Sequence, residues 1–229
     1  MPALGFDIDH TLCIDNKLER VAFLRLLELI VDAGGRVLGT LDDEIKAIDE
    51  LLVLQRGGAF SIDEAVRRFV SERGLEPKDD YVNRYRDMAV TMVDEFVVPL
   101  PGAKKTLAQL RDRGVPIAVL SNGWNPLQQR KADRIGFPGP VLVSADLGVQ
   151  KPDPRAFEAL VQALGTRPRD VWYVGDDPRN DVAGARNAGL RAVWLDAEGM
   201  PYPADLERPP VVISSLEELL SLLSDPVHR

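Results

Sequence analysis

Residues 4–12 read Leu4-Gly5-Phe6-Asp7-Ile8-Asp9-His10-Thr11-Leu12, an apolar run that carries two aspartates at its far end. Side chains alternate between the two faces of a strand, so Asp7 and Asp9 are predicted to leave it on the same face. Two neighbouring carboxylates repel each other unless a cation or a shared proton relieves them. One of them would bind metal or attack, and the other would move protons. Taken alone, the fragment is also compatible with an ordinary acidic turn.

Two further apolar runs end in residues suited to an anionic ligand. The run 115–120 is followed by Ser121 and Asn122, which offer a hydroxyl and backbone N–H groups to a phosphoryl oxygen. Lys151 follows the apolar stretch 141–149, and prolines on its C-terminal side keep the loop from starting a helix early. Each segment taken singly has a simpler explanation, a β-turn in one case and a solvated lysine in the other.

The run 171–174 ends in Gly175, Asp176 and Asp177. Gly175 permits a sharp turn, which would place Asp176 at the tip of the strand. Asp177 and Asn180 have an alternative role, because either could cap the helix that follows.

In this order, the segments resemble the haloacid dehalogenase-like (HAD) hydrolase superfamily. Its pattern is an Asp-x-Asp-x-Thr strand end, a Ser or Thr strand end, a lysine, and a Gly-Asp-rich strand end. The matching residues are Asp7, Asp9, Thr11, Ser121, Lys151 and Asp176. The resemblance covers nearly the whole chain apart from the middle of the predicted cap. One departure is His10, where the family most often has glycine.

The resemblance implies phosphoryl transfer through an aspartyl-phosphate. Asp7 would attack phosphorus, while Asp9 would first protonate the leaving oxygen and then activate the water that cleaves the intermediate. Mg²⁺ would be held by the Asp7 carboxylate, the Asp9 backbone carbonyl and the Asp176 side chain. Asp181 would orient a metal-bound water, and Asp177 is an alternative ligand.

The same resemblance assigns the phosphate-binding residues. Ser121, the Asn122 N–H and Lys151 would hold the equatorial oxygens, and Thr11 is counted with them. The implied substrate is a small phosphomonoester, either a phosphorylated metabolite or a nucleotide monophosphate.

Apolar runs alternate with helical patterns after residue 99, which predicts a doubly wound, Rossmann-like parallel α/β sheet. The reactive residues all fall at the carboxyl ends of strands, where ligands bind in such sheets. The predicted strands after the first are 115–120, 141–145, 171–174, 191–195 and 211–213. The predicted helices are 99–113, 126–135, 154–164 and 179–188, with a terminal helix capped by Ser215.

Residues 14–98 show helical spacing interrupted by glycine pairs, and we expect them to form a mostly helical cap. The catalytic core would then comprise residues 1–13 and 99–229, with a hinge near Ile14 and Pro99. The alternative is that these helices pack as an ordinary extension. The segment holds 12 basic and 18 acidic residues, a net charge of −6, which would repel a polyanionic substrate.

Composition excludes several classes of function. The net charge of −8 disfavours binding to nucleic acid or to anionic membranes. No apolar run approaches the ~18 residues of a membrane span, and Asp7 and Asp9 interrupt any signal-peptide pattern. The lone cysteine, Cys13, excludes an intramolecular disulfide and is expected to be a small buried hydrophobe. We therefore expect a cytoplasmic protein, and the sequence leaves its oligomeric state open.

Three rival functions share parts of this pattern. A haloacid dehalogenase attacks carbon without a metal, which would leave the acids at positions 9 and 176 unexplained. Phosphonate cleavage through a Schiff base would need a cap lysine in a position that the sequence does not indicate. A phospho-receiver also has an acceptor aspartate on a doubly wound sheet, but receivers are shorter and have no insert after the first strand.

Overall fold

The computed structural model describes residues 2–223 and divides into two compact units. One unit holds the chain up to Asp15 and from Val97 onward, and the other is Asn16–Phe96. Each unit has its own core, and the two are described separately below.

The first unit is built on a six-stranded sheet in which every neighbouring pair of strands is parallel. The strand order is β5-β4-β1-β6-β7-β8. The strands are β1 (Ala3–Phe6), β4 (Ile117–Ser121), β5 (Val141–Val143), β6 (Val171–Gly175), β7 (Arg191–Leu195) and β8 (Val211–Ile213). β1, β4 and β6 are buried along their whole length, as expected for a parallel sheet covered on both faces. The predicted α/β fold class is therefore confirmed.

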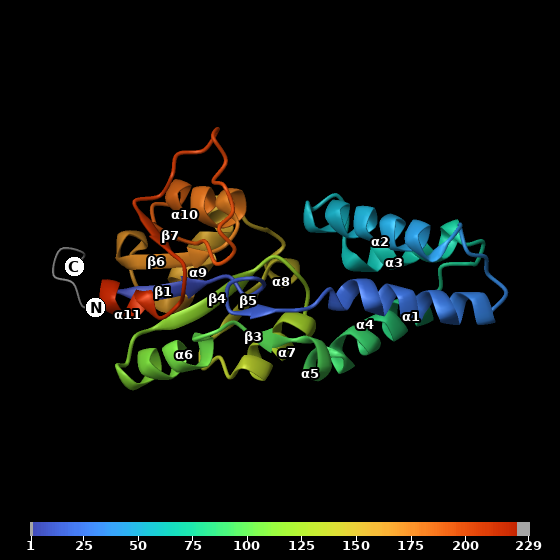
Figure 1. Cartoon of the computed structure of the whole chain (residues 1–229), viewed down its shortest axis with the longest axis horizontal. Coiled ribbons are helices and arrows are strands. Elements are labelled where there is room, and N and C mark those ends of the chain that lie inside the picture. The colour runs from blue at the N-terminus through green and yellow to red at the C-terminus, as the bar shows by residue number, and fades with distance from the viewer. Residues whose placement is uncertain (1, 224–229) are drawn as a thin grey trace. The chain divides into compact units, whose positions relative to one another are not determined.

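Helices cover both faces of this sheet (Figure 1). α6 (Ala103–Asp112) and α7 (Leu127–Ile135) lie on one side, and α9 (Pro154–Leu164) and α10 (Gly184–Asn187) lie on the other. Phe157 and Leu160 of α9 pack with Tyr173 of β6 in one buried cluster, with the Phe157 and Tyr173 rings 5.1 Å apart edge to face. This packing holds β6 in position within the sheet. Site residues follow the carboxyl end of that strand.

Several predicted elements differ from the structure. The helix predicted over 99–113 begins only at Ala103, because Pro99 is paired in a short strand, and the helix predicted over 179–188 is a π-helix over Pro178–Ala183 followed by α10. The predicted strand 141–145 ends at Val143, because the short helix α8 (Ser144–Leu147) begins there. The last helix, α11 (Glu218–Leu222), begins three residues later than the predicted cap at Ser215. The reason is that the Glu218 carboxylate accepts the backbone N–H groups of Ser214 and Ser215, which ties these residues into a turn before the helix.

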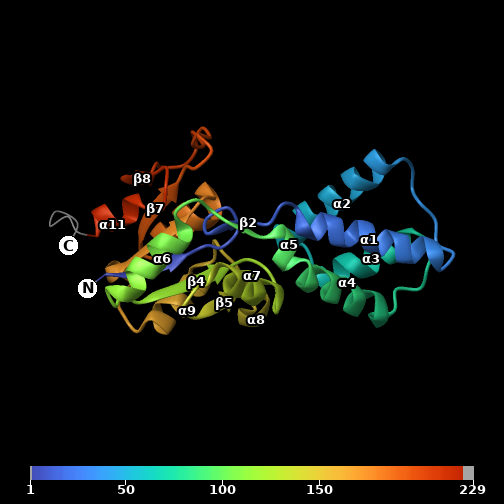
Figure 2. The same ribbon diagram turned by 60° about the horizontal axis from the view of Figure 1, so that its bottom comes forward.

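The second unit consists of α1 (Leu18–Asp32), α2 (Leu41–Arg56), α3 (Ile62–Glu72), α4 (Asp79–Thr91) and α5 (Val93–Phe96) (Figure 2). Thr40 and Asp43 form a capping box at the start of α2, and Ser61 caps α3. Phe23, Phe69 and Tyr85 join α1, α3 and α4 in one aromatic cluster. The predicted helical insert between β1 and β4 is confirmed.

The chain passes between the units beside a small antiparallel pair, β2 (Cys13–Ile14) and β3 (Val98–Pro99). This pair forms a sheet of its own and does not join the six-stranded sheet. The Asn16 side chain donates to the Phe96 carbonyl over 2.7 Å, so the outgoing and returning segments are tied together. Within residues 2–223, no helix combines the length and apolar character needed to cross a bilayer.

An ion pair lies in the core of the helical unit. Arg73 and Glu44 are fully buried and bonded to each other, and Arg73 also donates to the Phe69 carbonyl over 2.9 Å. Removing one member of such a pair leaves the other charge buried without its counter-ion.

We predict that Glu44→Ala lowers the free energy of unfolding of the helical unit by about 3–5 kcal/mol, because Arg73 then loses its buried counter-ion. Arg68→Ala breaks the exposed Arg68–Glu64 pair and is the matched control, with an expected change below about 0.5 kcal/mol. Chemical denaturation followed by circular dichroism measures both. Equal, small losses in the two variants would contradict the structural role given to the buried pair.

Candidate active site

The predicted reactive segments meet where the sheet reverses its winding. β1 lies between β4 and β6, and the connections that follow β1 and β6 lead to opposite faces. Asp7 continues β1, with its backbone N–H donating to the Val174 carbonyl over 2.9 Å. Ser121 is the last residue of β4 and is buried, and Asp176 follows β6. A topological switch point of this kind is where open α/β sheets bind ligands.

A tight turn over residues 10–12 follows the two aspartates. The Ile8 carbonyl accepts the N–H groups of both Leu12 and Cys13, so the chain turns back after Asp9. Asp7 and Asp9 have different hydrogen-bond partners, and the charge of Asp9 contributes to raising the pKa of Asp7. His10 adopts a φ of 58°, in the left-handed region that favours glycine. Cys13 is buried as expected, and burial raises its thiol pKa.

Thr11 lies beside Asp176. Its side chain is fully buried, and its hydroxyl donates to the Asp176 carboxylate over 3.0 Å. Thr11 therefore orients one acid of the site, and its contact with phosphate stays a prediction.

Lys151 lies at the centre of the site. Its buried ammonium group donates to Asp7 and to Asp181 over 2.7 Å each, and to the Tyr173 hydroxyl over 3.1 Å. Burial lowers the pKa of Lys151, but the charges of Asp181 and Asp7 outweigh this and raise it well above its ordinary value. The lysine is therefore a fixed positive charge beside Asp7.

Asn122 holds the backbone of Lys151 in place. Its side-chain amide accepts the Lys151 N–H over 2.8 Å and donates to the Lys151 carbonyl over 2.9 Å. This paired bond ties the end of β4 to the lysine loop 29 residues later in the chain. The Asn122 side chain is thus occupied, and any contact with phosphate falls to its backbone N–H.

The turn after β6 positions the remaining acids. A Cβ added to Gly175 would lie 2.3 Å from the Asp181 carboxylate, so only glycine leaves room for that side chain. Asp181 is buried, and it accepts the Asp177 N–H over 3.0 Å as well as the lysine. The Asp177 carboxylate accepts the N–H groups of Arg179 and Asn180, so it caps the π-helix Pro178–Ala183. The structure thus favours the capping role for Asp177.

Asp7, Asp176 and Asp181 form a cluster that could hold a metal ion, with one oxygen of each within 4.8 Å of the others. Burial is the largest cause that raises the pKa of Asp7 and of Asp176 to about 7, and that of Asp181 to about 6. The neighbouring carboxylates raise all three further. Lys151 neutralises part of the negative charge of these three acids, and an all-oxygen site with the remaining charge suits Mg²⁺.

Asp9 is held by residues whose role sequence reasoning missed. Lys131 of α7 donates to Asp9 over 2.6 Å and to Asp15 over 3.1 Å, and Gln128 donates to Asp9 over 3.0 Å. Lys131 is 1% exposed. A signal for it was present, because Lys131 falls on the apolar side of α7 together with Leu127.

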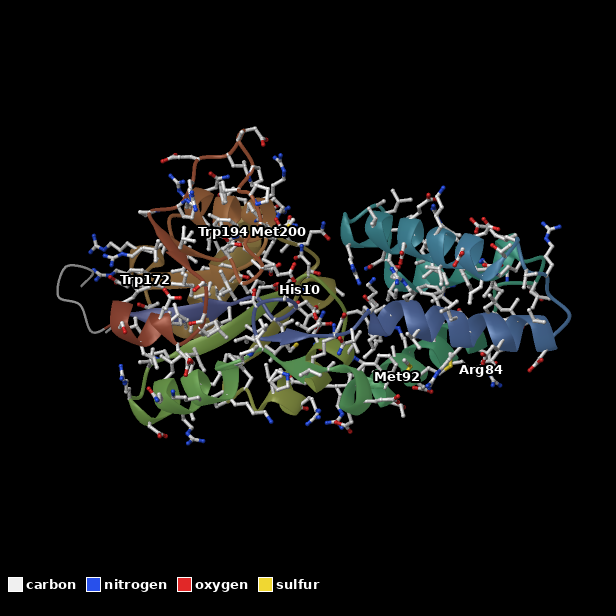
Figure 3. The ribbon with its side chains drawn as sticks, in the orientation of Figure 1. His10, Arg84, Met92, Trp172, Trp194 and Met200 are labelled. Atoms are coloured by element: carbon white, nitrogen blue, oxygen red, sulfur yellow. The ribbon has the colours of Figure 1, made fainter. Side chains whose placement is uncertain are left out.

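A cavity of about 570 Å³ adjoins this site within the first unit. His10 and Asp176 line one part of it, and Trp194, Met200 and Leu216 line another. Figure 3 labels His10, Trp194 and Met200 near the carboxyl end of the sheet. The lining is mostly apolar, and the Trp194 indole N–H donates to the Asp176 carbonyl over 3.0 Å.

Comparison with known proteins defines the class. Residues 1–189 match the family model described as haloacid dehalogenase-like hydrolase. The chain belongs to this family and is a hydrolase.

Named relatives are phosphatases. The chain is 32% identical to a glyceraldehyde 3-phosphate phosphatase from Pyrococcus furiosus, over 95% of this chain and 91% of that protein. It is 40% identical to a phosphoserine phosphatase from Thermus thermophilus, but that alignment spans only 57% of this chain and 54% of the relative. A solved HAD hydrolase, YfnB from Bacillus subtilis bound to magnesium, has the same fold, with a TM-score of 0.72, 23% identity, and coverage of 98% and 99%.

Gly175→Ala is predicted to displace the Asp181 carboxylate and, through it, the Lys151 ammonium. The expected result is a loss of hydrolytic activity of at least about a hundredfold, comparable to the loss of one electrostatic group in an active site. Gly165→Ala is the control, because that glycine ends α9 with open space around its Cα. Because Gly165 has a left-handed φ, Gly165→Ala should lower stability and leave activity unchanged. Full activity in Gly175→Ala would contradict the packing argument.

The raised pKa values of Asp7, Asp176 and Asp181 predict an unusual pH dependence of the stability of the metal-free protein. Between about pH 4 and pH 7, the folded state holds protons that the unfolded chain has already released, so the free energy of unfolding falls as pH rises. Each group contributes a slope of at most about 1.4 kcal/mol per pH unit. Mg²⁺ should stabilise the protein more near pH 7.5 than near pH 5.5, because protons compete with the ion. Denaturation at several pH values, with Asp112→Asn as the control and Asp176→Asn as the test, measures both effects. A metal-free stability that rises with pH across this window would contradict the assignment.

Proposed function

We propose that this protein is a Mg²⁺-dependent phosphatase that hydrolyses a small phosphomonoester through an aspartyl-phosphate on Asp7. The observation that carries the proposal is the position of Asp7. It is bonded to the buried Lys151 ammonium on one side and lies in the acid cluster with Asp176 on the other. A carboxylate held between a fixed cation and a metal site is suited to attack an anionic phosphoryl group.

Each residue of the site has a role in this reaction. The Asp7 carboxylate attacks phosphorus, and Asp9 gives a proton to the leaving oxygen. Asp9 then takes a proton from the water that cleaves the intermediate. Lys151, the Ser121 hydroxyl and the Asn122 N–H hold the phosphoryl oxygens.

The acid cluster fits the metal that the family implies. Asp7 and Asp176 would hold Mg²⁺ through their side chains, together with the Asp9 backbone carbonyl, and Asp181 would orient a bound water. The ion, when bound, shields Asp7 from the negative charge of the substrate and stabilises charge in the transition state. Thr11 keeps the Asp176 carboxylate facing this site.

The same site argues against dehalogenation of haloacids. That reaction needs a nucleophile and a way to bind a halide, but no second acid at position 9 and no acid at position 176. The raised pKa of Asp176 shows that its burial is costly without a cation. Such a cost is explained by metal-dependent phosphate chemistry.

The substrate is proposed to be a small phosphorylated metabolite or a nucleotide monophosphate. The two named relatives are phosphatases of small phosphorylated compounds, glyceraldehyde 3-phosphate and phosphoserine. The net charge of −6 over residues 14–98 disfavours a polyanion, and the net charge of the whole chain, −8, has the same sign.

We predict steady turnover of p-nitrophenyl phosphate that stops when the divalent metal is chelated. Asp7→Asn should lose activity by more than about 10,000-fold, because the covalent step has no substitute nucleophile. Asp112→Asn, on the exposed surface of α6, is the matched control and should retain full activity. A colorimetric assay at matched protein concentration compares them.

Three outcomes would overturn the proposal. Activity retained in Asp7→Asn removes the nucleophile. Release of halide from a 2-haloacid, without phosphate release from any ester, favours the dehalogenase. A single phosphorylation without turnover favours a receiver. A panel of metabolite and nucleoside monophosphates, with a phosphopeptide and a 5′-phosphorylated oligonucleotide included, tests the substrate class.

A further inference from the structure

We propose that Gln128 and Lys131 of α7 are positioning residues for proton transfer, and that together they hold the Asp9 carboxylate apart from the metal-binding acids. The proposal rests on the proposed phosphatase function and gives a role to two residues that had none in it. We call Gln128 and Lys131 the α7 clamp.

The first argument is the geometry of the clamp. Lys131 donates to Asp9 Oδ1 over 2.6 Å, and Gln128 donates to Asp9 Oδ2 over 3.0 Å. Both carboxylate oxygens are therefore bound from the same helix, which fixes the plane of the carboxylate as well as its position. Asp9 remains 27% exposed on its side chain, so a substrate can still reach it.

The second argument is the burial of the clamp. Lys131 is 1% exposed and Gln128 is 4% exposed, although both side chains are normally found at the surface. Burying an ammonium group is costly unless it is paired, and Lys131 is paired with both Asp9 and Asp15. A helix face that needed only to pack against the sheet would be served better by apolar side chains at these positions.

The third argument is that neighbouring residues make room for the clamp. A Cβ added to Gly123 would lie 2.5 Å from Gln128 Nε2, so glycine at this position lets the amide reach across to Asp9. The Gln128 Oε1 atom is buried without a hydrogen-bond partner among the described residues. The reversed amide would set that oxygen against the carboxylate, so the bond to Asp9 determines the orientation of the amide.

The consequence concerns the chemistry of Asp9. A carboxylate next to an acid cluster can turn toward a bound cation and become a ligand, and it is then lost as a proton donor and acceptor. The α7 clamp prevents this turn by supplying a cation and an amide on the other side. Asp9 thereby stays available to give a proton to the leaving oxygen in the first step and to take a proton from water in the second.

The test compares two esters, one with an activated aryl leaving group and one with an unactivated alkyl leaving group. Protonation matters most for the alkyl ester, because an alkoxide leaves poorly without a proton. We expect Lys131→Met to lower kcat for the alkyl phosphate by about tenfold to a hundredfold more than kcat for p-nitrophenyl phosphate. Gln128→Met should shift the two rates in the same direction by a smaller factor. Equal losses on the two esters would show a merely structural role and would overturn the proposal.

Matched controls separate positioning from folding. Gln129→Met changes the adjacent exposed glutamine of α7 and should leave both rates unchanged. If Lys131→Met does not fold, Gln128→Met carries the test, because it removes one hydrogen bond from a neutral donor and leaves the Lys131–Asp9 ion pair in place.

A second measurement does not depend on turnover. In a crystal structure of Gln128→Met/Lys131→Met, the Asp9 carboxylate should swing away from α7. If it stays in place, the clamp does not position it and the proposal fails. Failure of the wild-type protein to hydrolyse either ester would instead overturn the proposed function, and the position of Asp9 in the double variant would still decide the role of the clamp.

Discussion

Compensation of buried negative charge is the constraint on which the site depends. Asp7 and Asp181 share the ammonium group of Lys151, while Asp9 and Asp15 share that of Lys131. Two lysines do not balance these acids together with Asp176, and burial, together with the neighbouring carboxylates, raises the pKa of Asp7 and of Asp176 to about 7. In the proposed reaction, a divalent cation would supply the missing charge beside Asp7, which must stay ionised to react.

The two lysines come from segments on opposite faces of the sheet. Lys131 lies on α7, which covers one face of the sheet, and Lys151 precedes α9, which covers the other. Asp7 and Asp9 are two residues apart in the chain, yet they are bound from opposite sides. In the proposed reaction, this separation leaves one carboxylate to attack phosphorus and the other to transfer protons.

Much of this arrangement could be predicted from the sequence. The apolar runs that end in Asp7, Ser121 and Asp176 predicted the buried strands, because parallel strands covered on both faces are apolar along their whole length. The polar residues that follow predicted the site, because ligands bind at the carboxyl ends of such strands. Helical spacing correctly predicted the insert between β1 and β4. Gly175 was expected to permit a turn, and the structure adds that its missing side chain leaves room for Asp181.

Other features could not be predicted because they depend on contacts distant in sequence. The bond from Thr11 to Asp176 joins residues 165 positions apart, so no local sequence pattern indicates it. The bond from Lys131 to Asp9 spans 122 positions, and a helix lysine suggests a surface residue until the helix is packed. Asp177 was left between two roles, and only the hydrogen bonds of the π-helix favour capping.

The central claim is that Asp7 and Asp9 divide the reaction into two displacements at phosphorus. The most direct measurement is the stereochemical course of hydrolysis with a substrate whose phosphorus is chiral through oxygen isotopes or sulfur. Attack by Asp7 followed by attack of water inverts the configuration twice, so the account predicts net retention. Net inversion would show that water attacks the substrate directly, and it would contradict the role of Asp7 as nucleophile.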